Sequence, residues 1–123
     1  MEKAKILIVE DECTIAKCLK IMLAQVGYCI VDIVASGEEA VAIALQTRPD
    51  LVLMDIKLSG KIDGITAFKQ IRKSADIPVV FVTAYADKVF IDRAMLMNPS
   101  GYVVKPFKSA TLLHAVETAL AEH

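Results

Sequence analysis

Five polar residues stand directly after short apolar segments of the chain. They are Glu10, Asp11, Asp55, Thr83 and Lys105. Two carboxylates within a few ångströms of each other repel unless a cation lies between them, and hard oxygen ligands in an open cavity suit Mg²⁺. A magnesium ion in such a site keeps several waters, which phosphoryl oxygens can replace. The residue types therefore indicate a site where a phosphoryl group bridges a metal ion, the hydroxyl of Thr83 and the ammonium of Lys105.

Asp55 is the candidate nucleophile of this set. Phosphoryl transfer depends mainly on positioning and charge neutralisation, and a carboxylate can attack phosphorus to form an aspartyl phosphate. Simpler explanations exist for single residues. Asp55 could bond the backbone of the following turn, Asp11 could favour a helix N-terminus, and Thr83 could be a β-branched strand residue. We favour the chemical interpretation because one site then explains both acids and Lys105.

The segments before these residues are typical of strands in a parallel sheet. Five runs rich in valine, isoleucine and leucine, most of them too continuous for half-exposed strands, span residues 5–9, 28–35, 51–54, 78–82 and 102–104. Stretches with helical spacing span residues 12–26, 36–47, 64–73, 87–97 and 109–122. This alternation predicts a doubly wound α/β domain with a five-stranded parallel sheet and five helices. The second strand is followed by no chemical residue and would be an edge strand in the order 2-1-3-4-5. Ligands bind outside the carboxyl ends of such strands, where the five polar residues would meet.

Two of the predicted helices carry start signals. Ser36 and Glu39 have the spacing of a capping box, and Ser109 stands where it could cap the last helix. These signals place the first turns of the second and fifth helices.

Composition predicts one globular, cytoplasmic domain. The chain has 123 residues, and 14 basic against 15 acidic residues leave a net charge of -1, which argues against direct nucleic-acid binding. No apolar run reaches the roughly 18 residues of a membrane span, so we expect no membrane insertion. Cys13, Cys18 and Cys29 are odd in number and lack CxxC spacing, so we expect reduced thiols buried as small apolar residues.

Five sequence segments together resemble the receiver domain of two-component response regulators, which has the flavodoxin-like form of this fold. The segments are "ILIVEDE" at 6–12, "LVLMDIKL" at 51–58, "DG" at 63–64, "VVFVTAYAD" at 79–87 and "GYVVKPF" at 101–107. The resemblance covers essentially the whole chain, so we expect residues 1–123 to form a single receiver domain. These residues leave no length for an effector domain, whether the domain stands alone or belongs to a longer protein. It implies a regulatory phosphoacceptor and not an enzyme.

The resemblance also implies a role for each site residue. Asp55 would accept a phosphoryl group from a histidine kinase or a phosphotransfer protein. Asp11, Asp55 and the backbone carbonyl of Lys57 would bind Mg²⁺, and Glu10 would assist through a water. Thr83 and Lys105 would bind the phosphoryl oxygens.

Tyr102 matches the switch aromatic of the family, which turns inward when Thr83 moves. The surface of the fourth helix, fifth strand and fifth helix would then change its affinity for a downstream protein partner. The bond between Lys105 and Pro106 is expected to be cis. Lys57 and Tyr85 flank the route by which water would attack the phosphate.

The chain departs from the family pattern in the loop after Asp55. Ser59 replaces the usual proline, and Asp63 and Gly64 arrive one residue late. We expect this longer loop to be more mobile and to alter the metal side of the site or the rate of phosphoryl loss.

Rival functions fall into two classes, an enzyme and a protein interaction module. A hydrolase that forms an aspartyl phosphate would carry D-x-D after the first strand, where this chain has "EDE" at 10–12. A P-loop enzyme is disfavoured because Asp55 and Ile62 replace the required glycine and hydroxyl residue. The alternative of a protein interaction module, with the same fold but without regulation by phosphate, stays open.

Four further residues are expected to play no part in the chemistry. We interpret His114 and His123 as surface residues, and Met95 and Met97 as core or interface residues.

Overall fold

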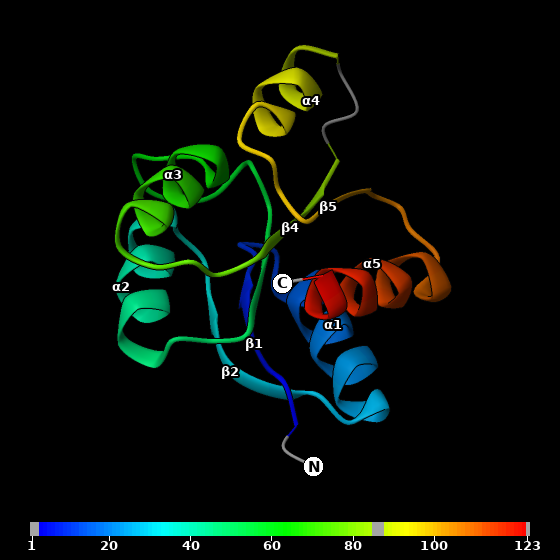
Figure 1. Ribbon diagram of the computed structural model, residues 1–123. Helices are drawn as coiled ribbons and strands as arrows, with labels where there is room; N and C mark the ends of the chain where they lie inside the picture. The colour runs from blue at the N-terminus through cyan, green and yellow to red at the C-terminus, as the bar shows by residue number, and fades with distance from the viewer. Residues whose placement is uncertain (1–2, 85–87, 123) are drawn as a thin grey trace.

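The computed structural model describes residues 3–84 and 88–122. In this part of the chain, five strands alternate with five helices (Figure 1). The elements are β1 (Lys5–Val9), α1 (Cys13–Val26), β2 (Cys29–Val34), α2 (Gly37–Thr47), β3 (Leu51–Met54), α3 (Gly64–Ser74), β4 (Val79–Thr83), α4 (Lys88–Met95), β5 (Gly101–Val104) and α5 (Ser109–Glu122). The strands form one parallel sheet in the order β2-β1-β3-β4-β5. The predicted fold class and strand order are confirmed.

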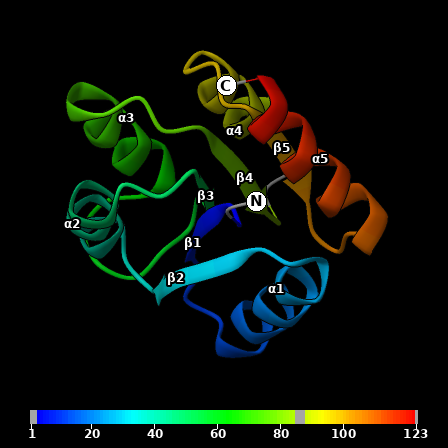
Figure 2. The same ribbon diagram turned by 60° about the horizontal axis from the view of Figure 1, so that its bottom comes forward.

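Alternate residues of each strand feed two separate cores. On β1, Leu7 and Val9 belong to one core together with side chains of α2, α3 and α4, whereas Ile6 and Ile8 belong to another together with side chains of α1 and α5. This alternation follows from the two-residue period of a strand. Figure 2 shows α2 and α3 together on one side of the sheet and α1 and α5 on the other. The inner strands are therefore buried on both faces, as their continuous apolar runs predicted.

The register of the sheet brings the strand ends together. Val9 of β1 lies opposite Met54 of β3, and the N–H of Asp55 donates to the carbonyl of Val9 at 3.0 Å. At the other end of the same edge, Thr83 of β4 pairs with Val104 of β5. Because all five strands run in one direction, the residues that follow them lie along one edge of the sheet.

The predicted N-cap is confirmed for α2 but not for α5. Ser36 is the N-cap of α2, and its hydroxyl oxygen accepts the N–H of Glu39 at 3.1 Å. Ser109 is the first residue of α5, so its prediction as the cap was wrong by one position. The carbonyl of the preceding Lys108 already accepts the N–H of Leu112.

The three cysteines are free thiols but are exposed, so the prediction of burial was wrong. On α1 the buried positions are Ala16, Leu19 and Leu23, and Cys13 and Cys18 lie on the outward part of the helix. Cys29 begins β2, an edge strand of the sheet. Apolar neighbours in the sequence did not reveal which face of each element packs.

Among the described residues, we find no helix with the length and apolar character needed to cross a membrane.

Candidate functional site

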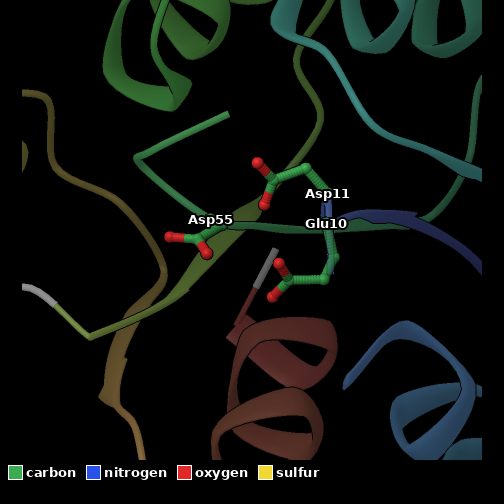
Figure 3. Close-up of side chains that lie close together, drawn as sticks. All are labelled: Glu10, Asp11 and Asp55. Carbon is green, nitrogen blue, oxygen red and sulfur yellow. The ribbon is translucent and has the colours of Figure 1, made fainter. Parts of the chain in front are cut away.

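Three carboxylates meet at the carboxyl ends of β1 and β3 (Figure 3). Glu10, Asp11 and Asp55 each offer an oxygen that lies within 4.8 Å of the other two. Glu10 and Asp55 are buried, with 4% and 6% of their surface exposed, whereas Asp11 is open to solvent. The pairing of β1 with β3 explains this meeting, since residues 10 and 55 directly follow the paired Val9 and Met54.

Lys105, which directly follows the edge strand β5, binds both buried acids. Its Nζ donates to Oδ2 of Asp55 at 2.8 Å and to Oε1 of Glu10 at 2.5 Å. The N–H of Lys105 donates to the carbonyl of Thr83 at 2.9 Å, which extends the β4–β5 pairing by one residue. The bond between Lys105 and Pro106 is cis, as predicted.

Burial and pairing shift the pKa values of the two long side chains. Burial raises the pKa of Glu10 above its ordinary value, and the hydrogen bond from Lys105 only partly offsets this. Burial alone would lower the pKa of Lys105, but hydrogen bonds to Asp55 and Glu10 outweigh it and raise that pKa. Lys105 is therefore held as a cation at neutral pH.

One oxygen of the cluster has no partner within the part of the chain that the structure describes. Asp55 Oδ1 is buried and makes no hydrogen bond, although its sister oxygen binds Lys105. A buried carboxylate oxygen without a partner is costly. The ammonium of Lys105 bridges two of the three clustered carboxylates, so negative charge remains in excess there. Clustered hard oxygens, one of them orphaned, fit a divalent cation such as Mg²⁺.

A cavity of about 200 Å³ opens beside Asp55. Its lining includes Asp11, Glu12, Asp55, Lys57, Thr83 and Lys105. Thr83 is buried and Lys57 is exposed, so the cavity has a closed side at β4 and an open side at the β3–α3 loop. A group that entered the cavity would meet carboxylates, a hydroxyl and an ammonium.

The other residues singled out from the sequence lie around this centre. Tyr102 is half-buried on β5, with its ring centroid 6.2 Å from that of Phe81. His114 is exposed on α5, as predicted. Met95 is exposed on α4, and Met97 packs against the core.

Tyr85 and His123 lie outside the described residues.

The structure places two further residues, Glu12 and Glu38, at or near the site, and the sequence had indicated no role for either. Glu12 lines the cavity, and its N–H donates to Glu10 at 3.2 Å. Its position in the "EDE" triplet, beside Glu10 and Asp11, was the sequence signal that could have indicated a place at the site. Glu38 contacts the loop after Asp55, and no sequence signal connects these two segments.

The fold and site define a class of doubly wound α/β proteins with an acidic centre at the carboxyl ends of β1 and β3. The family model for the response regulator receiver domain matches residues 6–117. The chain therefore belongs to the response regulator receiver family, whose domains are regulatory parts of two-component signal transduction.

Relatives and solved structures agree with this assignment. The chain is 38% identical over 117 residues to the transcriptional regulatory protein PdtaR of Mycobacterium tuberculosis, covering 95% of this chain and 57% of that protein. It is 36% identical over 118 residues to a probable transcriptional regulator, ycf27, of Guillardia theta, covering 96% of this chain and 46% of that protein. The chain thus spans about half the length of these curated relatives.

Two solved receiver structures superpose over nearly the whole chain. The signal receiver domain of a modulated diguanylate cyclase from Desulfovibrio desulfuricans has a TM-score of 0.91 and 36% identity, covering 98% of this chain and 96% of that one. The receiver domain of the sensor histidine kinase PA1611 from Pseudomonas aeruginosa has a TM-score of 0.88 and 30% identity, covering 98% of this chain and 99% of that one. In that structure a magnesium ion is coordinated in the active-site cleft.

Proposed function

We propose that residues 1–123 form one cytoplasmic receiver domain that is switched by phosphorylation of Asp55. A histidine kinase or a phosphotransfer protein donates the phosphoryl group, and the phosphorylated domain changes its affinity for a downstream protein. The observation that carries the proposal is the state of Asp55, a buried carboxylate with one oxygen held by Lys105 and the other without a partner among the described residues.

The residues around Asp55 have the functions that phosphoryl transfer needs. The Asp55 carboxylate attacks phosphorus, the bond to the donor breaks, and the donor's leaving atom keeps the electron pair. The ammonium of Lys105 and the hydroxyl of Thr83 bind the oxygens of the transferred group in the cavity. Positioning and charge neutralisation are the main requirements of this reaction.

Asp11, Asp55 and the backbone carbonyl of Lys57 are the residues that would hold Mg²⁺, and Glu10 would assist through a water. When bound, the ion supplies the positive charge that offsets the acids and the incoming phosphoryl oxygens. The buried, orphaned Oδ1 of Asp55 supports this assignment.

The output would pass through Thr83 and Tyr102 to the surface of α4, β5 and α5. Thr83 moves toward the phosphoryl group, Tyr102 follows it inward, and the surface changes shape. Exposed apolar side chains in and beside α4 support binding of a protein partner, since Val89 is 69% exposed and Leu96, which directly follows the helix, is 85% exposed. The net charge of -1 gives no support to direct nucleic-acid binding by this chain.

Intact-mass spectrometry after incubation with acetyl phosphate tests the proposal. The wild type should gain a Mg²⁺-dependent, base-labile phosphoryl adduct that Asp55→Asn does not form. Asp92→Asn, an exposed aspartate of α4, is the matched control and should be modified like the wild type. If neither acetyl phosphate nor a phosphorylated histidine donor modified the wild type, the fold would instead serve as a phosphate-independent interaction module.

A further inference from the structure

The loop between β3 and α3 is longer than the family pattern, yet its path is held against the N-terminal end of α2. The N–H of Ser59 donates to the carbonyl of Ala35 at 3.1 Å, and Ser59 forms an isolated parallel bridge with Ser36. Loop length alone predicted mobility. These backbone contacts instead anchor the loop four residues after Asp55.

Glu38 extends this anchor by binding the loop backbone. Its Oε2 accepts the N–H of Lys61 at 2.9 Å. Gly60 has a φ of +89°, and a Cβ at this position would lie 2.7 Å from Oε1 of Glu38. The Glu38 side chain thus lies directly against the loop backbone, at a point where the positive φ favours glycine.

The charge of Glu38 agrees with this contact. The N–H of Lys61 lowers the pKa of the Glu38 carboxyl below its ordinary value of 4.5, and smaller contributions come from other backbone N–H groups. Glu38 is therefore an ionised acceptor for the loop at neutral pH, although it is exposed to solvent.

Apolar packing continues the same contact. A Cβ on Gly37 would lie 2.6 Å from Cγ1 of Ile62, so this buried glycine leaves the space that Ile62 fills. Four successive loop residues, 59–62, therefore rest on the four residues 35–38.

The other end of the loop is closed by its own backbone. The N–H of Gly64 donates to the carbonyl of Ile56 at 2.7 Å. A Cβ on Gly64 would lie 2.1 Å from the carbonyl oxygen of Asp55, so the backbone here comes too close for any side chain. Only Lys57 and Leu58 remain between the two fixed points, Ile56 and Ser59.

We propose that Glu38 is a positioning residue for the metal site, because it fixes the loop backbone that presents the carbonyl of Lys57. This inference rests on the proposed function, which assigns that carbonyl to Mg²⁺. Glu38 acts through the loop and touches neither the metal nor the phosphoryl group.

The chain offers two variants that separate this role from a general helix effect. An acid in the first turn of α2 also stabilises the helix through its dipole, and Glu39 shares that turn. The Glu39 side chain bonds the hydroxyl of Ser36 and not the loop, so Glu39→Ala is the matched control. Glu38→Asp keeps the charge at the helix start but is one methylene too short for the loop.

The experiment measures the Mg²⁺ dissociation constant by titration calorimetry in the absence of any phosphodonor. Glu38→Ala and Glu38→Asp should both weaken binding by about tenfold, the lower end of the range for groups that orient metal ligands. Glu39→Ala should bind like the wild type. Amide hydrogen exchange should be faster at Lys61 in both Glu38 variants and unchanged in the control.

Each outcome has one meaning. If Glu38→Asp binds Mg²⁺ like the wild type, or if Glu39→Ala loses as much affinity as Glu38→Ala, the positioning role is wrong. If the wild type itself binds no Mg²⁺ and forms no adduct on Asp55, the proposed function fails instead. Should Glu38→Ala unfold, as circular dichroism would show, the comparison of Glu38→Asp with the wild type still tests the role.

Discussion

At the scale of single residues, the balance of charge around Asp55 dominates the behaviour of the site. Lys105 neutralises two buried acids that would otherwise be costly to keep ionised. Asp11 adds a third carboxylate at the open side. A folded domain with this arrangement depends on cations for part of its stability.

Replacement of Lys105 by methionine should destabilise the domain. Lys105→Met leaves Glu10 and Asp55 buried without their cation, and loss of one partner from a buried pair costs about 3 kcal/mol of unfolding free energy. Urea unfolding at pH 7 in EDTA measures this loss. Lys69→Met, an exposed lysine of α3, is the control and should change little. Equal stability of the two variants would contradict a stabilising role of the ion pairs.

The loss in Lys105→Met should be smaller at pH 5 than at pH 7. Burial already raises the pKa of Glu10, and removal of the ammonium removes a group that lowers it. A carboxyl with a raised pKa binds more protons in the folded than in the unfolded state, so folding stability falls as pH rises above 4.5. Urea unfolding of variant and wild type at both pH values gives the comparison. A destabilisation that does not change between them would show that Glu10 takes up no proton.

Mg²⁺ should stabilise the folded wild type. A ligand that binds only the folded state adds about 2.7 kcal/mol when present at 100 times its dissociation constant. Asp11→Asn should lose most of this gain without unfolding, because Asp11 is exposed. Thermal unfolding with Mg²⁺ and with EDTA measures the gain. An Asp11→Asn variant that Mg²⁺ stabilised as much as the wild type would remove Asp11 from the metal site.

At the scale of elements, α3 holds the turn between α4 and β5. The guanidinium of Arg72 donates to the carbonyls of Met97 and Asn98 and lies 4.2 Å from the ring centroid of Phe68. A second link joins Arg93 of α4 to Asp63, the N-cap of α3, at 3.2 Å. The two arginines bind different groups, so they should contribute differently to the free energy of unfolding.

Arg72→Ala should destabilise the domain more than Arg93→Ala. Arg72 is also exposed, but its two charged hydrogen bonds and its cation–π contact are together worth about 2 kcal/mol. The Arg93 ion pair is partly exposed, and such pairs contribute about 0–1 kcal/mol. Urea unfolding of the two variants at equal ionic strength provides the measurement. A larger loss of unfolding free energy in Arg93→Ala than in Arg72→Ala would show that the ion pair between Arg93 and Asp63 contributes more stability.

At the scale of the whole molecule, an aromatic row connects the core to the proposed output surface. The ring centroids of Phe68 on α3 and Phe81 on β4 lie 5.8 Å apart, and that of Tyr102 on β5 lies 6.2 Å from Phe81. Movement of Tyr102 would therefore repack both β5 and its contacts with β4. Under the proposed switch, Tyr102 would be the element that couples the site to the surface near α4.

Thr83→Ala should separate phosphorylation from its output. Asp55 should still accept a phosphoryl group, but amide chemical shifts of α4 and β5 should no longer change on phosphorylation, because the hydroxyl that follows the phosphoryl group is gone. Nuclear magnetic resonance spectra of the phosphorylated and unmodified variant make this comparison. Thr47→Ala, at the end of α2, is the control. Shift changes as large as those of the wild type would exclude Thr83 as the switch.

Much of the fold could be predicted because its signals are local. Continuous apolar runs marked the inner strands, and helical spacing marked each crossover. Parallel strands end at one edge, so the meeting of Glu10, Asp55 and Lys105 at that edge followed from chain order alone. Ser36 was recognised as a cap because its partner Glu39 is only three residues away.

The amino-acid sequence by itself determined the strand order, the edge that carries the site and the residue types found there. Only the tertiary structure decided that the three cysteines face solvent, since the face of a helix or edge strand that packs depends on its neighbours. It also decided the contact between Glu38 and the loop, because 23 residues separate Glu38 from Lys61. Contacts of this kind arise when α2 and the loop pack together, and no local pattern encodes them.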